Sequence, residues 1–432
     1  MNFRWLFPWC FAAALAWGTP AGAQALSAQQ ILQQFNAVIF DNFSASSDVE
    51  GRTVIGGDMA GGATFAVNPV AEAASEFADL TVYGNETSNK TFSLDGAQGI
   101  TIGGTNVGGF NLNDGGSVFI GGKNTGAFDV TGASASLSVV GRNSGQITLG
   151  SGGSVYVDGA NTNSISISGG STASDSVSIN GNNSGYLTLN NGGTVKVNGN
   201  AGSGSLNGGS LTYTGSKGTW TLNGATSTKV SSLSLPPPSD PLPSFASTFQ
   251  APLTSLATQL AALTPNSTVL TNGDNVTLEA HPNAQGQAVL DLSTSVFKPN
   301  ATVSVALNGA SSFIVNLSVA GCSKNCTYTV PNSVNFQNPT SYANSLLWNV
   351  TDVSTLSFTN EFAGTVLAPA ATVTTSSPID GTLVALNFNG SGELHDYPFN
   401  GKLPAPEPTS LAILSVALVG TGLLRRQRRP KL

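Results

Sequence analysis

The sequence of 432 residues is poor in charged side chains, which make up 9% of it, and it has only three Cys, two His and two Met. So little charge excludes a soluble helical protein, and it also argues against disorder, because disordered chains are usually rich in charge and poor in apolar residues. The net charge is −7, and Lys and Arg are scattered singly except for a cluster at the C-terminal end. Nucleic acid is therefore not an expected partner, since phosphate binding needs clustered positive charge. Hydrophobic residues make up 40% of the sequence and recur at regular intervals, so the chain can bury a core.

The first 23 residues are typical of a secretory signal peptide. Arg4 gives a positively charged start, residues 5–17 are apolar but too few to span a membrane comfortably, and Ala21 and Ala23 form a small-x-small cleavage site. We expect the mature chain to begin near Gln24. An N-terminal helix buried in a core is the alternative, but no amphipathic pattern supports it.

The C-terminal segment 404–432 combines three features in a fixed order. The motif Pro406, Glu407, Pro408 precedes a short apolar stretch over 411–424, which is followed by a basic end. Positive charges directly after a short apolar helix favour retention on the cytoplasmic side of a membrane. This order resembles a PEP-CTERM sorting tail. The resemblance implies an exosortase-type processing protease as a partner and transient anchoring in the inner membrane of a Gram-negative bacterium, before the protein reaches the cell surface or extracellular matrix. A simple tail anchor is the alternative.

Cysteine usage agrees with export. Cys10 leaves with the signal segment, so the mature chain keeps Cys322 and Cys326. In an oxidising compartment such a pair can close a small disulfide loop when the two Cα atoms come within about 7 Å. A zinc site would need further ligands, and His281 and His395 are far away in the sequence. We expect a disulfide, and no metal or other cofactor.

An internal repeat of 18 to 22 residues occupies residues 92–205. Each unit contains two pairs of apolar residues at positions i and i+2. The first pairs are Phe92/Leu94, Phe110/Leu112, Phe128/Val130, Ile147/Leu149, Ile165/Ile167 and Leu187/Leu189. The second pairs are Ile100/Ile102, Val118/Ile120, Leu137/Val139, Val155/Val157, Val177/Ile179 and Val195/Val197. This alternation predicts short strands, and so small a unit buries its apolar side only by stacking in parallel on its neighbours, about 4.8 Å apart. The expected fold is all-β, a parallel β-solenoid over about residues 80–205.

The turns of the repeat have a signature of their own, Gly-x-Asn. Its Asn residues are Asn106, Asn124, Asn143, Asn161 and Asn183. Gly supplies positive φ at a sharp corner, Asn tolerates the left-handed region, and stacked Asn amides can bond along the axis as a ladder. We interpret these Asn residues as structural. Residues between the apolar ones, such as Phe119 and Tyr156, are expected to face outward, and Lys123 and Arg142 to lie in adjacent turns without forming a catalytic pair.

The second half of the chain begins with a Pro-rich segment, residues 231–243, which predicts a stiff extended linker. Segment 244–264 then predicts an amphipathic helix that needs an apolar surface, and the flank of the solenoid is the nearest candidate. Its apolar residues are Phe245, Phe249, Leu253, Leu256, Leu260 and Leu263. Pro252 either kinks this helix or marks its start. Short strands return over 265–403, which we expect to complete one body with residues 24–230.

Two segments carry a family resemblance. Ser47 to Met59 and the closing segment 346–404 resemble the choice-of-anchor A family, a bacterial exported domain joined to varied C-terminal anchors. The likeness covers both ends of the mature body, and the repeat lies between them as an insertion. Ala363 to Val373 is also similar to the closing strands of ice-binding-type solenoids with a helix along one side, a likeness of fold that implies little about activity.

Three functions are compatible with such a body. The first is an adhesive or structural protein of the cell surface or exopolysaccharide matrix, because long polar faces with little charge can bond sugars or other surface proteins, and Phe119 and Tyr156 can stack on sugar rings. The second, ice binding, requires a flat array of Thr. The outward residues of the first strands form a mixed column instead: Asn111, Asp129, Thr148, Ser166 and Thr188.

The third function, an enzyme, has few residues to draw on. The candidates are Glu393, His395 and Asp396, with Asp48 and Glu50. No motif places a Ser or a second carboxylate beside His395, so no catalytic residue is predicted. Asp48, Glu50 and Asp58 are possible calcium ligands by type, but their spacing matches no defined loop.

Overall fold

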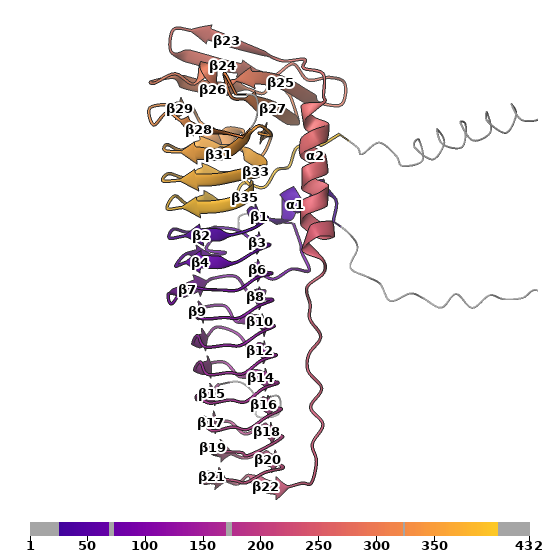
Figure 1. Cartoon of the computed structure of the whole chain (residues 1–432), viewed down its shortest axis with the longest axis vertical. Helices are drawn as coiled ribbons and strands as arrows, with labels where there is room; N and C mark the ends of the chain where they lie inside the picture. Colours follow the sequence, from indigo (N-terminus) through magenta and orange to yellow (C-terminus); the bar gives the residue numbers. More distant parts are fainter. Residues whose placement is uncertain (1–25, 69–72, 170–174, 323–324, 405–432) are drawn as a thin grey trace, which may run out of the picture.

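The protein is a long parallel β-solenoid whose turns have three sides (Figure 1). The computed structural model describes residues 26–68, 73–169, 175–322 and 325–404. The strand pairs in this part of the chain are parallel except for β23 (Thr268–Asn272) with β24 (Asn275–Glu279). The predicted all-β solenoid is confirmed.

The chain enters the solenoid in its middle. After α1 (Ala28–Gln34), strand β1 (Ala37–Ile39) pairs with β3 (Thr53–Ile55) on one edge and with β35 (Leu383–Gly390) on the other. From β1 the chain winds to the lower end in Figure 1, returns along the outside, and then winds back from the upper end. Strands near the two ends of the sequence are therefore neighbours, and the body is one continuous stack.

The three sides differ in strand length. The first side, from the lower end upward, consists of β22 (Thr226–Lys229), β20 (Ser210–Tyr213), β18 (Thr194–Val197), β16 (Ser176–Ile179), β14 (Gly153–Val157), β12 (Ala135–Val139), β10 (Gly116–Ile120), β8 (Gly99–Ile102), β6 (Leu80–Val82), β3, β1, the first half of β35, the first half of β33 (Thr365–Thr375), β30 (Leu346–Asn349), β27 (Ser312–Ser318) and β25 (Gln287–Ser293).

The second side is built from shorter strands. They are β21 (Trp220–Asn223), β19 (Ser203–Asn207), β17 (Tyr186–Leu189), β15 (Ile165–Ile167), β13 (Ile147–Leu149), β11 (Phe128–Val130), β9 (Gly109–Leu112), β7 (Thr91–Leu94) and β5 (Thr64–Phe65), continued through Val49 to β36 (Leu394–His395), β34 (Ile379–Asp380) and β32 (Phe362–Ala363). A separate sheet at the upper end contains β23, β24, β26 (Thr302–Ala306) and β29 (Asn335–Phe336).

The third side narrows from strands to single residues. Its strands are β28 (Cys326–Val330), β31 (Val353–Phe358), the second halves of β33 and β35, β2 (Phe43–Ala45) and β4 (Met59–Gly61). Below β4 it continues as one-residue bridges through Glu86, Asn106, Asn124, Asn143, Asn161 and Asn183. The predicted Gly-x-Asn turns therefore form the third side of the lower half.

The core consists of the inward columns that the alternating pairs predict. Phe92, Phe110 and Phe128 stack face to face with ring centroids 5.1 and 5.5 Å apart, and aliphatic side chains continue the column. At the lower end the two inward columns of the first side change character, because the last turn places Ser227 and Lys229 in them. The apolar columns of the first side thus stop one turn before its strands do, whereas Trp220 and Leu222 carry the core into the last strand of the second side.

A helix covers the upper part of the first side. One π-helical turn (Ala246–Gln250) leads into α2 (Ala251–Ala261), so Pro252 marks the beginning of α2 rather than a kink. Phe249, Leu253 and Leu260 are fully buried against outward residues of the strands beneath, as the predicted amphipathic face requires. These strand residues are Val54, Val38, Val384, Leu367, Leu347, Ile314 and Val289.

Asn residues also hold α2 to the sheet. Asn349 and Asn316 donate to the α2 carbonyls of Ala257 and Leu260 at 2.9 and 3.0 Å, and Asn349 also donates to the Asn316 side chain. The helix is therefore fixed along the axis as well as by apolar packing. Two short 3-10 helices, Thr294–Val296 and Pro339–Ser341, complete the described elements.

Candidate functional site

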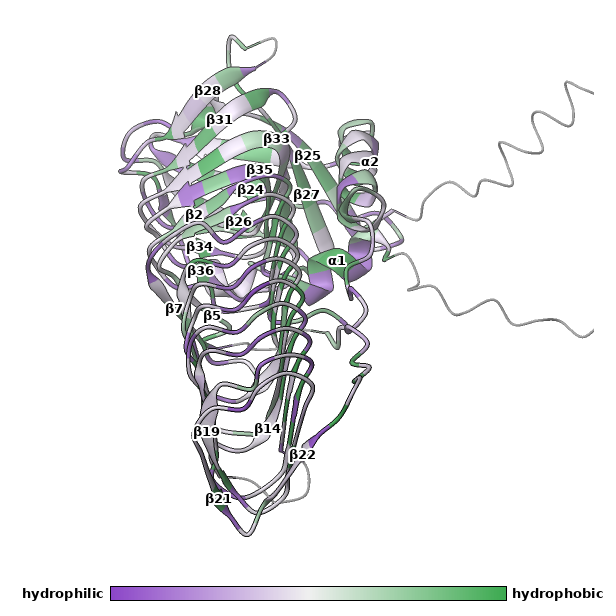
Figure 2. Ribbon diagram, turned by 60° about the horizontal axis from the view of Figure 1, so that its bottom comes forward, coloured by the Kyte–Doolittle hydropathy of each residue, from purple (hydrophilic) through white to green (hydrophobic). Residues whose placement is uncertain are grey.

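The lower part of the first side is covered by the returning chain, residues 231–243, which we call the strap (Figure 2). The Tyr156 hydroxyl lies 2.9 Å from the carbonyl oxygen of Leu235 in the strap and 2.9 Å from the Asp158 carboxylate. Phe119 is only 8% exposed. The expectation that Phe119 and Tyr156 are free to stack on sugar rings is wrong, because a distant segment of the chain packs on this face.

The second side keeps its polar column open. Asn111, Asp129, Thr148, Ser166 and Thr188 lie side by side in adjacent strands, and all five are exposed or half-buried. The column mixes amide, carboxylate and hydroxyl groups, as expected from the sequence. It is a face for varied hydrogen bonds and lacks the regularity that an ice lattice would need.

The third side carries a regular array that sequence reasoning missed. Four adjacent strands each present two outward residues at positions i and i+2. They form the columns Thr327, Thr355, Thr372, Asn387 and Thr329, Ser357, Thr374, Asn389. Within a strand the two positions are about 6.6 Å apart, and the strands are about 4.8 Å apart. We call this surface the Thr array.

The Thr array is partly bonded along its columns. The Thr374 hydroxyl donates to that of Ser357 at 2.8 Å, and the Asn387 amide donates to the Thr372 hydroxyl at 3.2 Å. Because these hydroxyls also face outward, they can bond a ligand surface. The available signal was the two-residue spacing of like residues, but the four segments recur at unequal intervals and were not recognised as one column.

The Asn ladder is internal. Asn106, Asn124, Asn143 and Asn161 each donate to the side-chain oxygen of the next Asn at 2.7 or 2.8 Å, and each also donates to the carbonyl two residues ahead. Their exposure is 0%, and that of Asn183 is 2%. The following Gly residues are required, because a Cβ at Gly126 or Gly145 would collide with the carbonyl of the turn before. The structural interpretation of these Asn residues is confirmed. The expected positive φ at the Gly-x-Asn corners is wrong, because neither the Gly nor the Asn of these turns has one; Gly is needed there for close approach of neighbouring turns.

His395 lies between carboxylates where the two ends of the chain meet. Its Nδ1 is 2.6 Å from Asp380, which is buried, and its Nε2 is 3.0 Å from Glu393. The hydrogen bond to Asp380, with that to Glu393, raises the pKa of His395 from 6.5 to about 9. Burial and the neighbouring Asp380 raise the pKa of Glu361. A histidine that is charged at neutral pH and engaged at both nitrogens pins strands together and is poorly suited to act as a base.

The other acidic candidates are divided between different contacts. Glu50 accepts the backbone N–H of Asp396 at 2.9 Å. Asp58 instead accepts from the backbone N–H of Asn85 at 2.7 Å and from its amide at 3.0 Å. Among the residues that the structure describes, no group of three or more His, Cys, Asp or Glu is arranged to hold a metal ion.

The remaining predicted site residues divide into two groups. Cys322 and Cys326 are joined by a disulfide at the start of β28, with their Cα atoms 6.0 Å apart. Ala21 and Ala23, like Pro406, Glu407 and Pro408, lie outside the described residues. Within the described ranges, no helix combines the length and the apolar character needed to cross a membrane.

Comparison with known proteins gives one family. The family model described as "Putative Ice-binding-like adhesive domain" matches residues 28–148 and 145–396. No curated protein matches the chain. Among solved structures, an ice binding protein from an Antarctic bacterium Flavobacteriaceae is 14% identical, with 87% of this chain and 98% of that chain covered and a TM-score of 0.21.

A second solved structure is the Tapirin C-terminal domain of Caldicellulosiruptor kristjanssonii. It is 11% identical, with 90% of this chain and 98% of that chain covered and a TM-score of 0.19. At such TM-scores neither structure informs the arrangement or the function of this protein. The family match, by contrast, extends over most of the solenoid on both sides of the point where the chain turns back. The chain belongs to the ice-binding-like adhesive domain family.

Proposed function

We propose that this protein is an exported, non-enzymatic adhesive component of the cell surface or exopolysaccharide matrix, and that its open polar faces bind neutral polysaccharide. The proposal rests on two uncovered faces, which are the polar column on the second side and the Thr array. Together they present hydroxyl and amide groups and a single carboxylate, that of Asp129. Such groups exchange bonds with water for bonds with sugar hydroxyls at little cost in desolvation. Membership of an adhesive domain family supports the same direction.

Export and processing are part of the proposal. The signal peptide with Ala21 and Ala23 would deliver the chain, and the PEP-CTERM tail with Pro406, Glu407 and Pro408 would hold it at the inner membrane until an exosortase-type protease cuts it. Assignment to the choice-of-anchor A family also remains a proposal, supported by the parallel bridge between Val49 and Leu394, which joins the two segments that carry the resemblance.

The test expresses the full chain in a Gram-negative host with and without an exosortase-type protease. The released protein is identified by mass spectrometry of its ends and screened against a panel of neutral and anionic polysaccharides and of hydrolase substrates. We expect release only with the protease, and binding to neutral polysaccharide without turnover. Retention in the cytoplasm, hydrolysis of a substrate, or absence of binding to any polysaccharide would contradict the proposal.

Ice binding is a second candidate function, because the Thr array supplies regularly spaced hydroxyls on one face. The test measures thermal hysteresis for the released protein and for a variant in which Thr355, Thr372 and Thr374 are replaced by Tyr. A control variant carries Tyr in place of Thr148 and Thr188 on the second side. Hysteresis that the first variant loses and the control keeps would support ice binding; no hysteresis in the unsubstituted protein would exclude it.

A further inference from the structure

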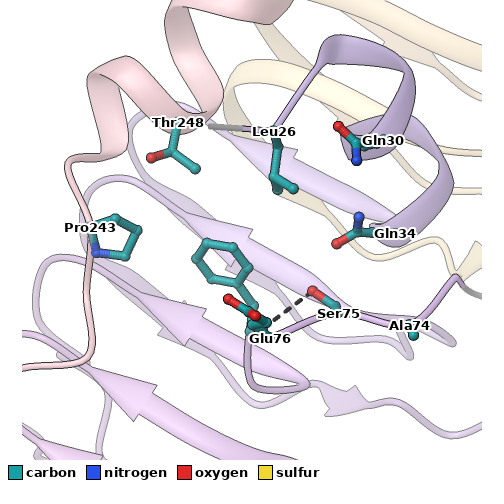
Figure 3. Close-up of a pocket in the computed structure, with 9 residues that line it drawn as sticks. Leu26, Gln30, Gln34, Ala74, Ser75, Glu76, Pro243 and Thr248 are labelled. Carbon is teal, nitrogen blue, oxygen red and sulfur yellow. Dashed lines mark hydrogen bonds between the residues drawn. The ribbon is translucent and has the colours of Figure 1, made fainter. Parts of the chain in front are cut away.

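A pocket of about 320 Å³ lies on the helix side of the solenoid, apart from the open faces (Figure 3). Three segments far apart in sequence surround it: α1, the loop over residues 74–77, and the chain where the strap meets the π-helical turn. Its size is at the small end of the range for pockets that bind organic ligands. It is large enough for a compact polar molecule, and the ligand would contact all three segments at once.

The lining combines an aromatic floor with hydrogen-bonding groups. Phe77 contributes the ring, which is held edge to face against Phe35 and Phe249 with centroids 5.6 and 5.0 Å apart. Leu26 and Pro243 add apolar surface. The polar groups around them are Gln30, Gln34, Ser75, Glu76 and Thr248. An aromatic ring surrounded by amide and hydroxyl groups suits a molecule with both C–H and O–H faces, as a sugar ring has.

Gln34 gives the most specific indication. The residue is 8% exposed, its side chain points into the pocket in Figure 3, and its amide has no hydrogen-bond partner among the described residues. The amide atoms reach the pocket space, so they bond solvent there until a ligand takes its place. The Thr248 hydroxyl, also 8% exposed, lines the same pocket and likewise has no partner there. A ligand with adjacent hydroxyls can donate to one group and accept from the other.

The walls of the pocket are fixed before any ligand binds. Arg52, 4% exposed, donates to the carbonyl of Gln34 at 2.8 Å and to that of Ala73 at 3.5 Å, and so ties the end of α1 to the start of the loop. Asp79 lies 3.9 Å from the same guanidinium. Because Arg52 is buried and engaged with these groups, it is not available to attract an anion into the pocket. The exposed Glu76 carboxylate at the rim repels one.

We propose that this pocket binds a single neutral hexose unit of a polysaccharide, with the ring on Phe77 and the hydroxyls on Gln34 and Thr248. This inference rests on the proposed adhesive function and adds a defined subsite to it. Recognition of one residue in a pocket supplies the selectivity that the flat polar faces lack, because a buried amide discriminates strongly between a hydroxyl that pairs with it and one that does not.

The test uses the released protein and saturation-transfer NMR with the methyl glycosides of glucose, galactose and mannose, and with glucuronate as the anionic probe. The variants are Gln34→Met and Thr248→Val, which keep the volume of the side chain and remove its hydrogen bonds. The matched control is Gln33→Met on the same helix. We expect binding of at least one neutral glycoside in the millimolar range, weaker binding of glucuronate, at least tenfold weaker neutral binding in both variants, and no change in the control.

Two outcomes would overturn the inference: no binding of any of the three glycosides by the unsubstituted protein, or binding by both variants as tight as that of the control. Far-UV circular dichroism and the thermal midpoint show whether each variant is folded. If Gln34→Met does not fold, Thr248→Val alone serves as the test. Polysaccharide binding that persists without glycoside binding overturns the subsite alone and leaves the adhesive function standing.

Discussion

The Asn ladder provides the sharpest test of how the lower half of the solenoid is held together. Asn143 is fully buried and takes part in three side-chain hydrogen bonds: it accepts from Asn124 at 2.7 Å, and it donates to Asn161 at 2.7 Å and to the carbonyl of Gly145 at 2.9 Å. Asn143→Asp keeps the shape of the side chain and the bond from Asn124. It removes both donations and places a carboxylate against two oxygen acceptors.

The expected cost follows from that geometry. Two buried acceptors lose their donor, at about 1–3 kcal/mol each, and the carboxylate itself has one donor left. We expect the free energy of unfolding to fall by about 3–5 kcal/mol at neutral pH. The loss should shrink in acid, because a buried carboxyl with a raised pKa is protonated there and can donate one bond again.

The control is Asn182→Asp, on the same side and one residue from the ladder. Asn182 is exposed, and its side-chain oxygen accepts from the backbone N–H of Asn200, a role that a carboxylate also fills. Urea unfolding followed by circular dichroism gives the free energy of unfolding of both variants, and hydrogen exchange locates the affected turns. If Asn143→Asp and Asn182→Asp both change stability by less than about 0.5 kcal/mol, the ladder does not stabilise the fold as argued.

Three further predictions concern other parts of the body. His395 stabilises the fold when it is charged, by on the order of 1 kcal/mol after allowance for its exposure. This contribution is complete below pH 6.5 and is lost as pH rises toward about 9, so the free energy of unfolding should fall over that range. His395→Gln should remove this pH dependence from urea titrations, and an unchanged dependence would refute the assignment. Tyr156→Phe removes the bond to Leu235 and should speed proteolysis within the strap several-fold, whereas an unchanged cleavage rate would mean that packing alone holds it. Replacing Ser227 and Lys229 by Val extends the apolar columns to an open strand edge and should cause end-to-end association, seen as faster sedimentation in analytical ultracentrifugation; unchanged sedimentation would show that these two polar residues do not protect the edge.

Some properties of the fold could be predicted because they are local. The apolar pairs at i and i+2 decide which side of each strand is inward, and this period survives in the structure as columns such as Phe92, Phe110 and Phe128. The repeated Gly-x-Asn motif fixes the conformation of the corner. Gly permits neighbouring turns to approach closely, and the Asn amide donates one hydrogen bond within its own turn and one to the next turn. Repetition makes each prediction reinforce its neighbours.

The surface could not be predicted in the same way. Alternation shows that Phe119 and Tyr156 point away from the core, but it cannot show that a strap more than 70 residues further along the chain will cover them. The Thr array likewise depends on strand register between segments such as Thr355 to Ser357 and Thr372 to Thr374, and register is set by pairing across loops of unequal length.

Local sequence patterns are therefore enough to predict the solenoid, its inward columns and its Asn ladder, because each depends on a short motif that repeats and acts within one turn or between neighbouring turns. The folded chain was needed to show which outward faces stay open, where β1 and β35 pair, and how three distant segments enclose the pocket around Gln34. These features depend on contacts between residues far apart in the sequence, from 79 positions for Tyr156 and Leu235 to more than 300 for β1 and β35, and no local pattern signals them.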